Sequence, residues 1–140
     1  MYDILKVLGI RRKIKESLFM YLHYKILKGF PLAMARRVQR LMKLSDAELA
    51  RLLAISVSTL RRMKKEQKRL STYSGDRLFR LAYVIVLAEK VFESEEAARN
   101  WITHTQPGLN GYRPLELIET YAGYEAVKNL LGRMEHGVYT

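Results

Sequence analysis

The sequence predicts an all-α fold, in which an N-terminal helical bundle with a helix-turn-helix is joined by a long helix to a small helical C-terminal domain. Three observations predict this class. Apolar residues recur every three or four positions along most of the chain, strand-type alternation is hard to find, and helix start and stop signals separate the periodic segments. With 140 residues, of which 49% are hydrophobic, the chain can form one ordinary core or two small subdomains that share a helix.

The first 30 residues predict an N-terminal extension of one or two amphipathic helices. Gly9 interrupts the helical spacing and Gly29 ends it. The apolar positions of this pattern are Ile4, Leu8, Ile14, Leu18, Leu22 and Ile26.

Residues 31–80 predict a helical DNA-binding region that begins at Pro31, a residue suited to the first turn of a helix. An apolar stripe follows, formed by Leu32, Ala35, Val38 and either Leu41 or Met42. Ser45 and Glu48 have the spacing of a capping box, in which each side chain accepts a backbone N–H of the other residue. We therefore expect a short helix at 46–53.

A second helix after the turn 54–56 completes a helix-turn-helix. The small side chain of Ala50 lets the two helices approach closely, while Leu53, Ile55 and Leu60 fill the wedge between them. Ala54 stands where such turns usually have glycine. The alternative is a plain helical hairpin with a solvated basic face.

The second helix is strongly basic and is expected to continue through Lys68 and Arg69 until residues 71–75 interrupt it. Its N-terminal part can enter a major groove. The residues expected to face DNA are Ser56, Val57, Ser58, Arg61, Arg62 and Lys65, and those that could instead reach phosphates are Ser58, Thr59 and Lys64.

The distribution of charge supports a nucleic-acid partner for the first half alone. Residues 1–77 contain 19 Lys and Arg against 6 Asp and Glu, a net charge of +13, whereas residues 78–140 contain 6 against 8, a net charge of −2. A basic half attracts polyanions, because each neutralised phosphate releases condensed counterions. The nearly neutral half is better suited to a protein partner.

Residues 81–140 predict a second helical domain, entered through a long buried helix at 78–92. Ser94 can cap a further helix that runs to Trp101 and Ile102, with Trp101 as a core anchor. Residues 107–111 are expected to form a loop, and Pro114 to start a short helix that ends at Thr120.

The last expected helix follows Gly123 and ends at Gly137, which would adopt a left-handed conformation. Its apolar positions are Val127, Leu130, Leu131 and Met134.

Catalytic and metal-binding patterns are not found. The chain has no cysteine, and His23, His104 and His136 lack the spacing of metal ligands. We therefore expect no enzyme activity and no cofactor. The apolar run at 78–88 contains Arg80 and is too short for a membrane span, and the basic residues near the N-terminus follow an apolar stretch, the reverse of a secretory signal. These features predict a cytoplasmic protein.

The C-terminal half resembles the toxin-binding domain of the Xre/MbcA/ParS antitoxins. The residues that carry the resemblance are Trp101 and Ile102, the run 107–118, Gly123, Val127, the run 130–134 and Gly137. The upstream half resembles the Xre-like helix-turn-helix of the same antitoxins, through residues 56–63, 69–71, Arg77, Arg80 and 88–92. Together the resemblance covers about residues 28–139.

The resemblance implies an antitoxin of a type II toxin–antitoxin module. Such a protein binds a RES-domain toxin that consumes NAD, or a related ADP-ribosylating toxin, and represses its own operon by binding operator DNA. It implies contact between the C-terminal end and the toxin's active-site cleft, and we expect Arg133, Gly137, Val138 and Tyr139 to cover that cleft. Gly111, Pro114 and Leu115 are expected to shape the adjoining contact surface.

Two other functions remain open from the sequence. The chain could be a stand-alone repressor whose C-terminal domain only dimerises, or an interaction protein whose basic half has no specific partner. A single helix-turn-helix contacts few base pairs, so DNA specificity favours a homodimer, with the N-terminal helices as one source of the interface. A homodimer and a toxin–antitoxin hetero-oligomer are therefore both expected.

Overall fold

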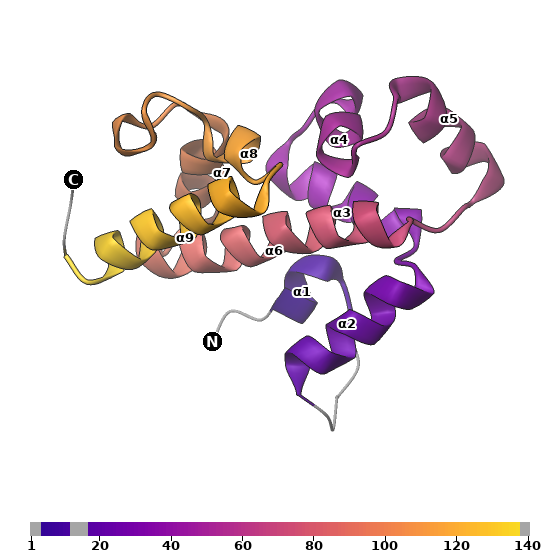
Figure 1. Cartoon of the computed structure of the whole chain (residues 1–140), viewed down its shortest axis with the longest axis horizontal. Coiled ribbons are helices and arrows are strands. Elements are labelled where there is room, and N and C mark those ends of the chain that lie inside the picture. Colours follow the sequence, from indigo (N-terminus) through magenta and orange to yellow (C-terminus); the bar gives the residue numbers. More distant parts are fainter. Residues whose placement is uncertain (1–3, 12–16, 138–140) are drawn as a thin grey trace. The chain divides into compact units, whose positions relative to one another are not determined.

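A computed structural model describes residues 4–11 and 17–137 and confirms the all-α prediction (Figure 1). Helices dominate these residues, and the only bridge of the β type among them is the isolated pair Pro31 and Arg69. The chain divides into two compact units, an N-terminal unit of residues 5–79 and a C-terminal unit that contains residues 80–137 and Ile4. No helix within the described part is long and apolar enough to cross a membrane.

Among the described residues, the N-terminal unit contains five helices, the first of them without its initial residue Ile4, and the first part of a sixth. Their bounds are α1 (Ile4–Leu8), α2 (Leu18–Lys28), α3 (Leu32–Met42), α4 (Asp46–Leu53), α5 (Val57–Glu66) and the start of α6 (Thr72–Phe92). Its largest fully buried side chains include Phe30, Leu49, Leu53, Leu60 and Leu78. Burial of these apolar groups is the main force that holds the unit together.

The N-terminal pattern forms two helices, as one of the expected alternatives stated. Gly9 and Gly29, with φ of 79° and 103°, follow α1 and α2 in backbone conformations that favour glycine. Pro31 is the N-cap of α3 and precedes its first turn. Ile14 lies outside the described residues.

The end of the basic helix was predicted wrongly. Helix α5 ends at Glu66, because Gln67 adopts a left-handed conformation with φ of 52°. Lys68 and Arg69 therefore lie beyond it. The chain then pairs with the start of α3, where the amide of Leu70 donates to the carbonyl oxygen of Phe30 over 2.8 Å.

The expected interruption at 71–75 is also wrong, since these residues begin the long helix. The hydroxyl of Ser71 accepts the amide of Ser74 at 3.1 Å, so it caps α6. Gly75 lies in the second turn, where an added Cβ would be 3.6 Å from Ile26 and Phe30. The serine and glycine residues of this segment favour a loop when only the local sequence is considered, but packing of α6 against α2 favours the helix.

The C-terminal unit comprises the rest of α6, three further helices and one 3-10 turn. These are α7 (Glu95–Thr103), the turn η1 (Pro107–Leu109), α8 (Pro114–Leu117) and α9 (Tyr121–Glu135). Helix α9 runs beside the C-terminal part of α6 in the same direction (Figure 1). Two contacts fix this register: Lys128 Nζ lies 5.6 Å from the ring centroid of Tyr83, and Lys90 Nζ lies 3.6 Å from Glu135 Oε2.

Two boundaries in this unit differ from the prediction. Helix α8 ends at Leu117, before Thr120, and α9 already begins at Tyr121, so Gly123 lies inside α9. Thr120 is the reason, because its hydroxyl accepts the amide of Gly123 at 3.0 Å and caps α9. Gly137 follows α9 with φ of 79°, as predicted.

Candidate functional sites

Helices α4 and α5 form the expected helix-turn-helix. The turn contains Ala54 in a left-handed conformation with φ of 60°, and the amide of Ile55 donates back to the carbonyl oxygen of Ala50 over 3.0 Å. Ala50 is buried at the crossing, together with Leu53 and Leu60. Ile55 is half-buried. The small side chain and the wedge therefore lie where the sequence placed them.

The N-terminal end of α5 is held by its own hydroxyl groups. Ser56 Oγ accepts the amide of Thr59 at 3.0 Å and donates to Thr59 Oγ1 over 2.9 Å. Both residues thus take part in capping α5, and Val57 is half-buried beside them. The side chains left exposed on α5 from the predicted set are Ser58, Arg61, Arg62, Lys64 and Lys65.

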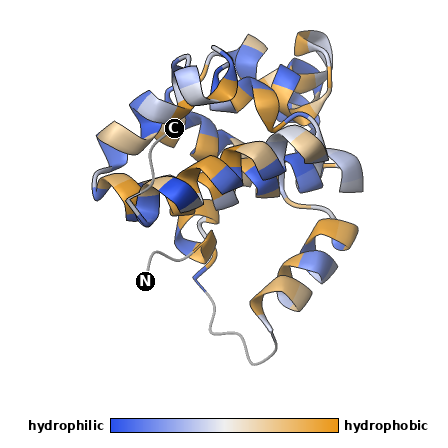
Figure 2. Cartoon of the chain, turned by 60° about the vertical axis from the view of Figure 1, so that its left-hand side comes forward, coloured by the Kyte–Doolittle hydropathy of each residue, from blue (hydrophilic) through white to orange (hydrophobic). Residues whose placement is uncertain are grey.

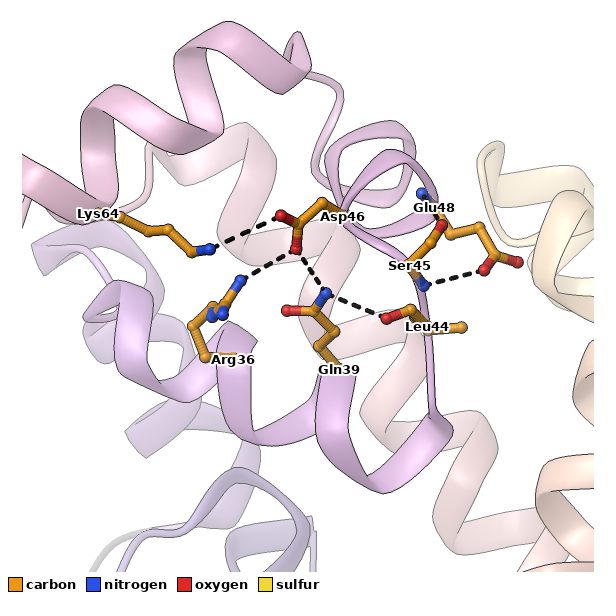
Figure 3. Close-up of polar contacts among 7 residues, drawn as sticks. All are labelled: Arg36, Gln39, Leu44, Ser45, Asp46, Glu48 and Lys64. Atoms are coloured by element: carbon orange, nitrogen blue, oxygen red, sulfur yellow. Dashed lines mark hydrogen bonds and ion pairs between the residues drawn. The ribbon is translucent and has the colours of Figure 1, made fainter.

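A polar network around Asp46 connects the three helices that precede and form the motif (Figure 3). Asp46 Oδ1 accepts from Gln39 Nε2 at 2.9 Å and from Arg36 Nη1 at 3.1 Å, both on α3. Asp46 Oδ2 lies 3.6 Å from Lys64 Nζ on α5. The hydrogen bond from Gln39, together with the charges of Lys64 and Arg36, lowers the pKa of Asp46. The carboxylate at the start of α4 therefore orients α5 relative to α3.

The capping box beside this network formed as predicted. Glu48 Oε1 accepts the amide of Ser45 at 3.0 Å, and Ser45 Oγ accepts the amide of Glu48 at 3.1 Å (Figure 3). Gln39 Nε2 also donates to the carbonyl oxygen of Leu44 over 3.0 Å, so it bridges the end of α3 and the start of α4.

The opposite end of α4 is capped by the first part of α6. Ser74 Oγ donates to the carbonyl oxygen of Leu53 over 2.5 Å, and Arg77 Nε donates to that of Leu52 over 2.6 Å. Both side chains are buried. The sequence had connected Arg77 with the motif only through a family resemblance; a buried arginine within an apolar helical stripe is the signal that could have revealed this role.

The residues expected to contact a protein partner differ in accessibility. Pro114 and Leu115 are buried within the C-terminal unit, so they support the packing of α8 and offer little surface. Gly111, Arg133 and Gly137 are exposed. Val138 and Tyr139 lie outside the described residues.

The loop before α8 is rigidly hydrogen-bonded. The amide of Gly111 donates to the carbonyl oxygen of Gln106 over 3.0 Å, and Gln106 Nε2 donates to that of Trp101 over 2.9 Å. Trp101 is buried, and its ring centroid lies 5.9 Å from that of Phe92. The prediction that Trp101 is a core anchor is confirmed, and this anchor fixes the loop that presents Gly111 and the exposed Tyr112.

Side chains that could bind a metal ion do not cluster in the part of the chain that the structure describes. His23, His104 and His136 are exposed, and His104, the C-cap of α7, has its Nδ1 2.7 Å from the carbonyl oxygen of Asn100.

Comparison with known proteins gives two family matches. Residues 22–83 match the model of the antitoxin Xre-like helix-turn-helix domain, and residues 87–137 match that of the antitoxin Xre/MbcA/ParS C-terminal toxin-binding domain. The first match begins at residue 22, inside the segment expected to be an N-terminal extension, and the second begins at residue 87. Neither domain is enzymatic, since one is a DNA-binding motif and the other binds a toxin.

Three curated relatives are named Antitoxin Xre. The proteins from Yersinia enterocolitica and Photorhabdus laumondii are 28% and 23% identical over 113 and 112 residues, which cover 80% and 79% of this chain and 76% of each relative. The protein from Pseudomonas putida is 28% identical over 83 residues, 59% of this chain, and the match spans about half (52%) of that relative. The chain belongs to the family of Xre-type antitoxins, which combine an Xre-like helix-turn-helix with an Xre/MbcA/ParS toxin-binding domain.

Proposed function

We propose that this antitoxin inhibits a RES-domain toxin that consumes NAD, acts in the cytoplasm, and represses its own operon. The observation that carries the proposal is the match of residues 87–137 to a toxin-binding domain, placed after a helix-turn-helix in one chain. A nearly neutral C-terminal half with a hydrogen-bonded loop suits a protein surface, and the basic first half suits operator DNA. A related ADP-ribosylating toxin is the second candidate partner.

Inhibition is proposed to occur by coverage of the toxin's active site by the C-terminal end of the chain. Arg133 and Gly137 are exposed at the end of α9, so this end is accessible to a partner. Val138 and Tyr139 would extend the contact, and Gly111 in the adjoining loop would contribute to its edge. An aromatic side chain and an arginine are the residue types that most often dominate the binding energy of an interface.

Co-expression with the neighbouring reading frame tests this proposal. We expect the two chains to co-purify, and the toxin to consume NAD only after the antitoxin is removed. A chain truncated after Met134 should still bind through the rest of the unit but fail to inhibit. The control is Gln67→Asn, a conservative exchange at an exposed position in the other unit, which should both bind and inhibit the toxin. Co-purification together with full inhibition by the truncated chain would refute active-site coverage and leave the antitoxin role intact; absence of any complex would refute both.

For operon repression, we propose that α5 enters the major groove of operator DNA. Arg61, Arg62 and Lys65 are exposed on α5 and can reach bases, while Ser58 and Lys64 are available for phosphates. Ser56 and Thr59 hold the N-terminal turn in shape, and Val57 packs beside them.

A homodimer is proposed because two half-sites need two recognition helices. Helix α2 has a buried face, yet Met20, Tyr24 and Leu27 remain exposed by about half, on one side of the helix at positions i, i+4 and i+7. Hydrophobic residues accordingly occur along the whole of α2 in Figure 2. Light scattering after gel filtration should give twice the chain mass, and the mass should halve when Met20 and Leu27 are replaced with Glu. Replacement of the exposed His23 with Glu is the control.

A further inference from the structure

A concave pocket of about 250 Å³ lies in the N-terminal unit, where α2 ends and α3 begins. Apolar side chains form one part of its lining, contributed by Ile10, Phe30, Pro31 and Met34. Its other side chains are one aromatic phenol and three cations, contributed by Tyr21, Lys25, Lys28 and Arg69. None of these residues belongs to the predicted DNA-facing set, so the pocket is separate from the surface assigned to α5.

Arg69 reaches this pocket because its segment of the chain packs directly against Gly29 at the end of α2. An added Cβ on Gly29 would lie 3.1 Å from Arg69 Cβ and from the carbonyl oxygen of Leu70, so only glycine fits without a shift. Arg69 Nη1 donates to the carbonyl oxygen of Gly29 over 2.8 Å, which fixes the guanidinium at the end of α2. Four of the five guanidinium N–H groups remain for a ligand.

Among the described residues, the cations of this pocket have no acidic partner, whereas three other cations of the unit, Arg36, Lys64 and Lys68, do. Lys64 and Lys68 lie 3.6 Å and 3.4 Å from Asp46 and Glu66, respectively. In contrast, no carboxylate of the described residues forms an ion pair with Lys25, Lys28 or Arg69, and none lines the pocket. Three close positive charges without a compensating acid repel one another, and an anion would relieve that repulsion.

We infer that the pocket binds a sugar phosphate. The planar guanidinium of Arg69 matches the geometry of phosphate oxygens, and the two ammonium groups add charge. The apolar side chains of the lining suit the face of a sugar, and the buried Tyr21, whose ring centroid lies 5.7 Å from Lys25 Nζ, holds that ammonium group beside them. The ligand has two sources with the same chemistry: the backbone of the operator DNA outside the base pairs contacted by α5, or a free nucleotide. Only the first source rests on the proposed DNA binding.

The DNA source is tested with the full chain and a long fragment of its own promoter. In the double variant, Lys25 and Lys28 are both replaced with Glu. The control replaces Arg40 and Lys43 with Glu, which reverses two exposed charges at the far end of α3. If the sugar-phosphate backbone of the DNA occupies the pocket, the double variant should bind the fragment about 10-fold or more weakly than the control. The slope of the logarithm of the binding constant against the logarithm of the salt concentration should decrease in magnitude by about 1–2. Circular dichroism melting verifies that all variants fold.

The nucleotide source is tested by titration of the full chain with deoxythymidine 5′-monophosphate, followed by amide chemical shifts. Shifts at Gly29 and Leu70 that are absent with thymidine, and absent in the double variant, would establish a free nucleotide as ligand. The inference is overturned if both variants bind DNA equally and the nucleotide causes no such shifts. If the wild-type chain binds no promoter DNA at all, repression is refuted, and the nucleotide titration alone decides the pocket.

Discussion

The guanidinium of Arg77 donates from Nε to the carbonyl oxygen of Leu52 over 2.6 Å, and thereby connects α6 to the C-terminal end of α4. Its Nη2 donates to the carbonyl oxygen of Arg51 over 3.1 Å. The last carbonyls of a helix have no partner within the helix, and a positive charge is favourable beside them. Because Arg77 is only 4% exposed, these bonds are shielded from water. Arg77 therefore acts with Ser74 to hold the C-terminal end of the first helix of the DNA-binding motif.

Replacement of Arg77 with Leu should lower the free energy of unfolding by about 2–3 kcal/mol, because it leaves the buried carbonyl oxygen of Leu52 without its donor, whereas that of Arg51 keeps the amide of Ala54. Urea denaturation measures the change. The exposed Arg62 is the control, and Arg62→Leu should change stability by less than about 0.5 kcal/mol. Equal stability of the two variants would show that the capping bonds contribute little.

The turn of the motif contains a strained residue. Ala54 has φ of 60°, a region that costs a residue with a Cβ about 1 kcal/mol relative to glycine. Ala54→Gly should therefore raise the free energy of unfolding by about that amount. The same exchange at the exposed Ala126, in the middle of α9, should lower it by about 0.5–1 kcal/mol. A loss of stability in Ala54→Gly, measured by denaturation, would contradict the strain.

Local signals in the sequence predicted the bounds of α4 correctly. The capping box of Ser45 and Glu48 lies within four consecutive residues, so its geometry can be read from their spacing alone. Residues 71–75 were misread for the same reason: serine and glycine favour loops locally, whereas the contact of Gly75 with Phe30 depends on a distant segment. Gly123 was placed before α9 because glycine is disfavoured within helices.

The candidate site was predictable in part. The wedge of Leu53 and Leu60 followed from the motif's spacing, and the structure buries both. The network at Asp46 was not predicted, since Arg36 lies ten positions before it and Lys64 is on another helix. Such contacts depend on how the helices pack, which periodicity does not specify. Which of the exposed residues on α5 contact bases stays a prediction.

The network at Asp46 predicts a pH dependence of stability. Because Gln39, Lys64 and Arg36 lower the pKa of Asp46 in the folded chain, its carboxylate stabilises the fold above the unfolded pKa, about 3.9. That contribution is lost as the pH falls below about 4 through the lower folded pKa. Melting temperatures between pH 7 and pH 2.5 should therefore fall less steeply in Asp46→Asn than in the wild type.

A second carboxylate provides the comparison for that experiment. The pKa of Glu125 is also lowered, chiefly by a hydrogen bond from Lys128, which lies 3.1 Å away. Asp46→Asn should retain the acid sensitivity due to Glu125, and adding Glu125→Gln should remove this part too. If Asp46→Asn had the same pH profile as the wild type, the network would not contribute to folding.

If the exposed arginines of α5 contact bases, their removal should weaken binding to promoter DNA. Arg61→Ala combined with Arg62→Ala should weaken binding to the promoter by about 1–3 kcal/mol for each lost base contact, as measured by mobility shift at fixed salt. Arg40→Ala combined with Lys43→Ala, at exposed positions at the end of α3, is the control for net charge. Equal affinity of the double variant and this control would remove α5 from the recognition role.

Two glycines in α9 should respond in opposite directions to the same substitution. An added Cβ on Gly123 would clash with the carbonyl oxygen of Leu117, a backbone atom that cannot move without disturbing α8. Gly123→Ala should therefore lower the free energy of unfolding by about 2–3 kcal/mol. In contrast, an added Cβ on Gly132 would have no described neighbour within 4 Å. Gly132→Ala should therefore raise the free energy of unfolding by about 0.5–1 kcal/mol. Thermal denaturation of both variants distinguishes this close contact of α9 with α8 from a general effect of glycine on helix propensity, which would shift both melting temperatures upward.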